Sequence, residues 1–71
     1  MKHMELAIAT VAPAMWSRAV EVFGSEEKAA GWMWTRLHQL GGRTPCEVLA
    51  ENANSVEVAT LLDRIDYVIY N

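Results

Sequence analysis

The sequence is poor in the residues that disulfides and metal sites require. Its 71 residues include one cysteine and two histidines. The single cysteine, Cys46, excludes an internal disulfide, which fits a reducing compartment such as the cytoplasm. Together with His3 and His38 it does not supply three or four ligands at a workable spacing. We therefore expect a cytoplasmic protein that binds no metal and no cofactor.

Clusters of basic residues are lacking as well. The net charge is −3, and the six Lys and Arg residues are scattered along the chain. Binding to nucleic acid or to an anionic membrane surface needs clustered positive charge. The longest uncharged run, residues 6–17, is too short to span a bilayer. It ends in an Ala-Pro-Ala stretch like that of a signal peptide, but the early Glu5 argues against secretion.

Motifs for catalysis or phosphate binding are missing. The chain holds no GxSxG, HExxH or P-loop pattern. Two glycines at 41–42 have no strand before them, so they indicate a structural joint better than a phosphate loop. A Cys46–His38 dyad across this joint is a weaker alternative, because a small thiol in a first helical turn normally serves packing. The sequence therefore predicts a protein that is not an enzyme.

What the chain has in excess is apolar side chains. Hydrophobic residues make up 52% of it and include three tryptophans. A domain of this size buries only about 60% of the surface that its unfolded chain exposes. Extra burial in an oligomer or against a partner is therefore expected. Because no stretch alternates as a strand would, we predict an all-α fold, a compact small bundle of about four short helices that dimerises.

Proline and glycine predict the first helix boundaries. A short helix or arm is expected over residues 5–11, and Pro13 either ends it or opens the next helix. The following helix should cover residues 14–23, where apolar residues recur at helical spacing. Gly24 suits the left-handed position that commonly ends a helix.

Ser25 is expected to cap a second helix that runs to about residue 37. Trp32 should lie on its core side, where truncation to alanine would cost about 3–5 kcal/mol. Trp34 points to another face of the same helix. It is therefore surplus to a single core.

Thr44 opens a T-x-x-E capping box with proline at the first helical position, which predicts a short helix to about residue 50. Ser55 should cap the last helix, over about 56–69. Its apolar stripe follows helical spacing. The stripe consists of Val58, Leu61, Leu62, Ile65, Val68 and Ile69.

Two segments of the chain, taken in order, resemble a known domain. They are AVEVFGSEEKAAGWM and LGGRTPCEVLAENANSVEVATLLDRIDYVIYN. Their spacing is similar to that of the toxin-binding domain of the Xre/MbcA/ParS antitoxins, with its A-x-x-V-F-G, A-x-x-W-L, L-G-G-x-T-P-x-x-L-L and V-x-x-L-L-x-R-I patterns. The matching residues are Ala19, Val22, Phe23, Gly24, Ala29, Trp32, Met33, Leu40, Gly41, Gly42, Thr44, Pro45, Leu49, Val58, Leu61, Leu62, Arg64 and Ile65.

This resemblance implies a non-catalytic antitoxin whose partner is a RES-domain toxin that consumes NAD. The C-terminal helix would pack over the entrance of the toxin active site, and the antitoxin would form a homodimer. By position in the closing motif, Arg64, Tyr67, Tyr70 and Asn71 would lie at the toxin surface. Arg43, in the glycine joint, is a further candidate for toxin contact. The alternative is a small helical homodimeric adaptor without a toxin partner.

The chain also departs from the family pattern. Arg36-Leu37-His38 stands where a Pro-Asn-Pro-like turn is usual, which favours a longer second helix. The usual glycine near the end of the last helix is replaced by Val68. The residues before Trp16 are too few for a helix-turn-helix, so DNA binding is not carried over to this segment. We expect residues 1–13 to form an N-terminal arm or short helix and residues 14–71 to form the antitoxin-like domain.

Overall fold

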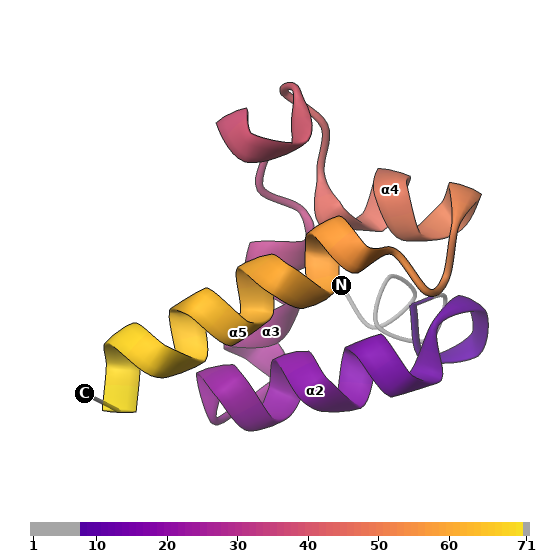
Figure 1. Cartoon of the computed structure of the whole chain (residues 1–71). Coiled ribbons are helices and arrows are strands. Elements are labelled where there is room, and N and C mark those ends of the chain that lie inside the picture. Colours follow the sequence, from indigo (N-terminus) through magenta and orange to yellow (C-terminus); the bar gives the residue numbers. More distant parts are fainter. Residues whose placement is uncertain (1–7, 71) are drawn as a thin grey trace.

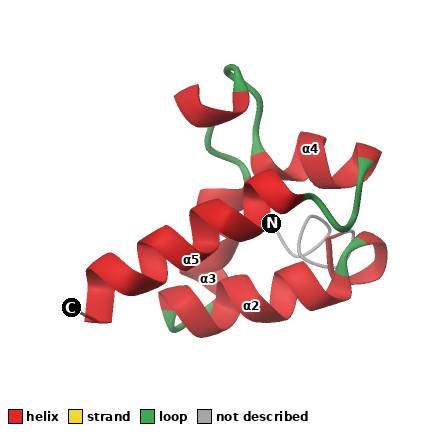
Figure 2. Ribbon diagram, in the orientation of Figure 1, coloured by secondary structure: helices red, strands yellow, loops and turns green. Residues whose placement is uncertain are grey.

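The computed structural model describes the chain from residue 8 to residue 70, and its side chains up to residue 68. Within that part the fold is helical with no strand, which confirms the all-α prediction (Figure 2). Residues 8–11 are also helical. The elements that follow are α2 (Pro13–Phe23), α3 (Glu26–Met33), the 3₁₀ turn η1 (His38–Leu40), α4 (Pro45–Glu51) and α5 (Val56–Tyr70).

The helices pack around one small core. Helix α2 contacts both α3 and α5, and α4 contacts α3 and α5 from the other end of the bundle (Figure 1). The segment with η1 projects away from this body (Figure 1). The largest fully buried side chains include Met33 of α3, Leu49 of α4 and Leu62 of α5. The core therefore takes residues from three helices that lie apart in the sequence.

Helix α2 has the boundaries that the sequence predicts. Pro13 occupies its first turn, and Trp16, Ala19 and Val22 are its buried residues. Gly24 ends it with φ at 82°, and its N–H donates to the carbonyl of Val20 at 2.8 Å. The left-handed backbone at this position explains the glycine.

Helix α3 begins as predicted but ends four residues early. The hydroxyl of Ser25 accepts a hydrogen bond from the Lys28 N–H at 3.2 Å, which is the expected cap. The prediction of a helix to residue 37 is wrong, because the chain turns after Met33. The Thr35 hydroxyl donates to the Gly31 carbonyl at 2.8 Å, and that bond occupies a carbonyl at the helix end. The residues of the turn thus replace helical hydrogen bonds with local ones.

The segment after α3 closes on itself and so cannot extend the helix. The N–H of Leu37 donates to the Arg43 carbonyl at 3.0 Å, and the Gly42 N–H donates to the Leu37 carbonyl at 3.0 Å. These bonds tie the two ends of the η1 segment together.

The two tryptophans near the end of α3, Trp32 and Trp34, differ from each other in burial. Trp32 lies at the margin of the core, partly buried, with its ring centroid 5.6 Å from that of Phe23. It packs against the core from the predicted side of α3, while Met33 is the fully buried side chain of that helix. Trp34, at the end of α3, is 44% exposed, as its surplus position predicts.

Helix α5 is buried only along its first half. Ser55 caps it as predicted, its hydroxyl accepting from the Val58 N–H at 3.3 Å. Val58 and Leu62 are fully buried, and Ile65 is half-buried. Val68 is 74% exposed although it belongs to the same apolar stripe. The second half of α5 therefore extends beyond the core that receives the first half (Figure 1).

Candidate functional site

The glycine joint is a turn followed by a capped helix. Gly41 and Gly42 have φ values of 70° and 83°, a region that side chains disfavour. The Thr44 hydroxyl then accepts from the Glu47 N–H at 3.1 Å, and the Glu47 carboxylate accepts from the Thr44 N–H at 2.8 Å. Both bonds of the predicted capping box are present. They occupy two of the donors that a phosphate at this helix start would need.

The capping hydrogen bond also affects the titration of the Glu47 carboxyl. The backbone N–H of Thr44 holds the pKa of Glu47 below its ordinary value, with smaller contributions from Arg36 and Arg43. The carboxylate, which is ionised at neutral pH in any case, stays ionised to a lower pH than an ordinary glutamate. It serves the helix start, where negative charge is favourable.

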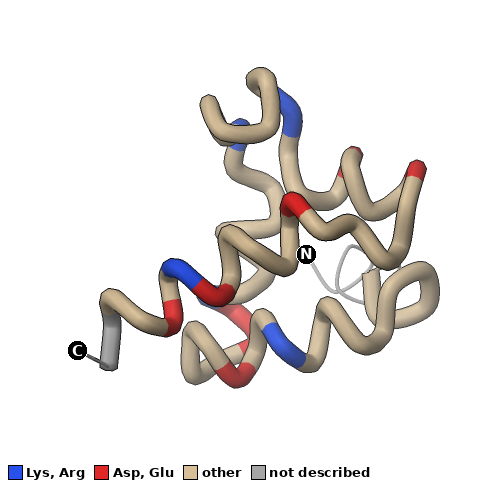
Figure 3. Tube along the Cα trace, in the orientation of Figure 1, with Lys and Arg blue, Asp and Glu red and all other residues tan. Residues whose placement is uncertain are grey.

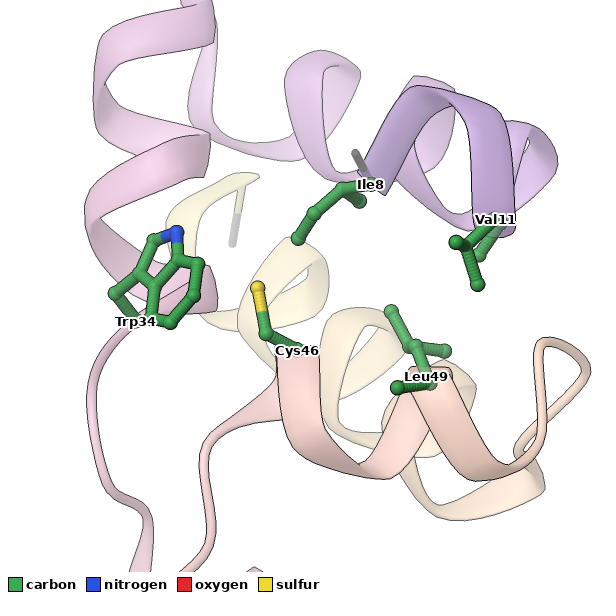
Figure 4. Close-up of a pocket in the computed structure, with 7 residues that line it drawn as sticks. Ile8, Val11, Trp34, Cys46 and Leu49 are labelled. Carbon is green, nitrogen blue, oxygen red and sulfur yellow. The ribbon is translucent and has the colours of Figure 1, made fainter. Parts of the chain in front are cut away.

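The position and the neutral thiol of Cys46 both suit a packing role. Burial, with a smaller contribution from the Glu47 carboxylate, raises the pKa of the thiol to about 11. The thiol is therefore protonated at neutral pH, whereas a nucleophilic cysteine needs the thiolate. His38 lies in η1, on the projecting segment, while Cys46 lies in α4 and faces the N-terminal helix (Figure 4). This arrangement argues against a dyad of the two residues.

Arg43 is already engaged in an ion pair. Its guanidinium lies 2.9 Å from the carboxylate of Glu51, at the other end of α4. Both side chains are substantially exposed, so the pair contributes little to stability.

The other predicted contact residues lie on or after the second half of α5. Arg64 and Tyr67 are exposed, Tyr67 by 69%. The side chain of Tyr70 and the whole of Asn71 fall outside the described residues. The structure thus brings Arg64 and Tyr67 together on one helix. It places Arg43 apart from them, beside α4.

A groove adjoins the second half of α5. We call it the α3–α5 groove, and its volume is about 270 Å³. It lies between the end of α3, the segment after it and α5. Its main lining residues are Trp32, Leu37, Leu61, Arg64, Ile65 and Val68. The groove is therefore lined mainly by apolar side chains, with Arg64 as a cationic one.

A second groove lies on the α4 side. Its volume is about 180 Å³. Figure 4 shows Cys46 and Leu49 of α4 opposite Ile8 and Val11 of the N-terminal helix, with the Trp34 ring at one end. Trp34 and Val11 are 44% and 49% exposed. This surface, the α4 groove, is therefore also apolar and open.

Comparison with known proteins identifies the family of this domain. Residues 18–67 match the family model of the antitoxin Xre/MbcA/ParS C-terminal toxin-binding domain. This chain belongs to that family. The Xre/MbcA/ParS match includes Arg43, Arg64 and Tyr67, whereas Tyr70 and Asn71 come after its last residue.

A relative among the curated proteins gives the same result for the Xre/MbcA/ParS domain. Antitoxin Xre of Yersinia enterocolitica serotype O:8 / biotype 1B is 33% identical over 54 residues. The match covers 75% of this chain and 36% of that protein, so the chain spans about a third of the relative's length. No solved structure matches the chain.

No helix in residues 8–70 is long and apolar enough to cross a membrane. The same part of the chain contains no group of three or more His, Cys, Asp or Glu residues that could hold a metal ion.

Sequence reasoning missed the α3–α5 groove of this Xre/MbcA/ParS domain. The predicted helix includes Leu37, four residues beyond the observed end of α3, so the turn that forms one wall of the groove is absent from that prediction. Between Met33 and Leu37 stand Trp34, Thr35 and Arg36, and Thr35 is the available signal for a turn, because its hydroxyl competes for helical hydrogen bonds.

Proposed function

We propose that this chain is a non-catalytic antitoxin module that neutralises a RES-domain, NAD-consuming toxin. The C-terminal helix α5 would pack over the entrance of the toxin active site. Family membership supports an antitoxin role with a toxin partner. The observation that carries the choice of surface is the second half of α5, where an apolar stripe continues past the core and becomes exposed at Val68.

The chemistry of this surface fits a protein partner. Val68 is 74% exposed and Tyr67 69% exposed, on the helix that also forms one wall of the α3–α5 groove. Apolar and aromatic groups beside an arginine are typical of the few residues that carry most of the energy of an interface. Arg64 supplies that arginine at the groove edge. Its guanidinium can pair with a carboxylate in two-point geometry.

The remaining contacts belong to the same proposal. Arg43 would exchange Glu51 for an acidic group of the toxin. Tyr70 and Asn71 would extend the α5 surface towards the toxin active site. The protein would act in the cytoplasm as a homodimer, and the arm of residues 1–13 would precede the toxin-binding domain of residues 14–71.

A second function is favoured by the α4 groove, which is apolar and exposes Trp34 and Val11. Contact between two copies through this groove would suit a small helical homodimeric adaptor with no toxin partner. Sedimentation of the chain alone, compared with its Trp34→Ser variant, measures such self-association. Dimerisation without any toxin binding would support this second function over the first.

The test of the proposed function is co-expression of this chain with a RES-domain, NAD-consuming toxin, with cellular NAD as the readout. We expect NAD to be preserved with the wild-type chain. Continued NAD depletion by an active toxin in the presence of the folded chain would contradict the proposal. Purified proteins then allow the affinity to be measured by calorimetry.

Two valines of α5 provide a matched pair of variants. Val68 and Val56 are 74% and 76% exposed, at opposite ends of the helix. Val68→Ser should weaken toxin binding about tenfold, which is the effect of removing roughly one buried valine's worth of apolar contact. Val56→Ser should leave the affinity unchanged. Equal effects of both variants would show that the second half of α5 is not the toxin-binding surface.

A further inference from the structure

The two halves of α5 are held to the domain in different ways. The first half is attached by apolar burial, since Val58 and Leu62 are fully buried. Beyond Leu62 the burial decreases, and Tyr67 and Val68 are mostly exposed. Apolar packing therefore holds the first half of α5 more firmly than the second half.

Arg18 of α2 forms ion pairs with the second half of α5. Its Nη2 atom lies 3.2 Å from Oδ1 of Asp63 and 3.1 Å from Oδ2 of Asp66. Its Nη1 atom lies 3.7 Å from the carboxylate of Glu21, one turn further along α2. Among the described residues, both ion pairs that join α2 to α5 are made by Arg18. Figure 3 shows basic and acidic positions on both of these helices.

Arg18 is surrounded by acidic side chains from both helices. Asp63 and Asp66 are three residues apart on α5 and therefore lie on neighbouring turns of one face. Together with Glu21 they place three carboxylates around one guanidinium. The hydrogen bonds to Asp63 and Asp66 raise the pKa of Arg18, and a guanidinium is charged throughout the physiological pH range. Without that charge the acidic groups of α2 and α5 would repel one another.

We propose that Arg18 is a positioning residue that holds the second half of α5 against α2 and so directs the helix towards the toxin. The proposal rests on the function proposed above. Asp63 and Asp66 face α2, while Arg64 turns to the α3–α5 groove. Arg18 therefore holds α5 from the Asp63 and Asp66 side, away from Arg64 and Val68, whereas Tyr67 follows Asp63 by four residues and lies next to the ion pairs. Arg64 and Val68 remain exposed while Arg18 is paired with the two aspartates.

A guanidinium suits this task better than an ammonium group. Arg18 uses one terminal nitrogen for the two carboxylates of α5 and the other for Glu21. Lysine is a single point charge, so Arg18→Lys should retain only part of the effect. The cluster is partly exposed, and its strength should therefore fall as salt is added.

Amide hydrogen exchange of the chain alone tests the positioning directly. In Arg18→Ala, amides of residues 66–70 should exchange about fivefold faster at low salt, the scale of an ion pair of this kind. Amides of residues 58–62 should keep their wild-type rates, because burial holds them. The difference should fall below about twofold in about 1 M salt, where the Debye length is short. Lys28→Ala, which removes a positive charge from exposed α3, is the matched control.

Several results would overturn the proposal. Equal exchange at residues 66–70 in wild type and Arg18→Ala would show that Arg18 does not hold this half of α5. Equal acceleration in both halves would indicate a loss of overall stability instead of a local one. In an Asp63→Asn, Asp66→Asn background, Arg18→Ala should have no further effect. A full effect there would show that Arg18 acts through another partner.

Toxin affinity then separates this proposal from the one on which it rests. Arg18→Ala should weaken binding of the RES-domain toxin severalfold at low salt and less at high salt, with Lys28→Ala unchanged. If the wild-type chain binds no toxin while the exchange results hold, the proposed function fails and the positioning of α5 stands. If the wild type binds and Arg18→Ala binds equally well, the positioning does not serve toxin binding, and the inference is refuted.

Discussion

The start of α4 allows a quantitative test of how this domain is stabilised. Thr44→Ala removes the hydroxyl that accepts from the Glu47 N–H at 3.1 Å. Thr44 is 6% exposed, so water has little access to replace the lost acceptor. Helix α4 has seven residues and would not be stable in isolation. Its cap therefore affects the attachment of Val48 and Leu49, which are buried in the core.

The expected loss follows from the cap. Removing a Thr N-cap costs about 1–2 kcal/mol, towards the upper end where the site is buried. A 71-residue domain has roughly 4–10 kcal/mol of stability in total. With a urea m value of about 1 kcal/mol per M, the unfolding midpoint should fall by about 1–2 M.

Urea unfolding followed by circular dichroism and tryptophan fluorescence measures this shift. Thr44→Ser is the matched control, because it retains the hydroxyl and loses only a methyl group. It should unfold close to wild type. A midpoint decrease below about 0.3 M for Thr44→Ala, well under the cost of a lost cap, would refute the reasoning. Equal midpoints for the serine and alanine variants would refute it as well, because the hydroxyl would then contribute nothing.

Three further predictions concern charge, packing and reactivity. The folded pKa of Glu47 is lowered, so its stabilisation is complete above the unfolded value of about 4.3 and is lost as the pH falls through the lower folded value. In Glu47→Gln the melting temperature should therefore fall less steeply than in wild type as the pH is lowered through that range, as measured by thermal unfolding. Leu62 is fully buried, and Leu62→Ala should cost about 2–5 kcal/mol in urea unfolding, whereas a loss under about 1 kcal/mol would mean that the cavity collapses. Cys46 should react slowly with iodoacetamide at pH 7, with the rate still rising above pH 9, because its pKa is about 11; a plateau near neutral pH would contradict this.

Local signals in the sequence determined most of the secondary structure. Gly24, Ser25 and Thr44 act through hydrogen bonds to residues within four positions, so their caps could be predicted without knowledge of the fold. The one boundary that was wrong, the end of α3, depends on pairing between Leu37 and Arg43 across a turn. That pairing competes with helix extension, and apolar spacing does not reveal it.

The surface of the site was decided by tertiary structure. The apolar stripe of α5 is continuous in the sequence, yet its first half is buried and its second half is exposed. The reason is that the other helices of the domain cover only part of the length of α5. The same holds for Arg18, whose contacts with Asp63 and Asp66 span 45 and 48 residues. The sequence alone determined the helices, their caps and the family resemblance, since these rest on short-range order. Only the packing of α2, α3 and α5 decided which residues remain available to a partner, because exposure depends on what lies opposite each side chain.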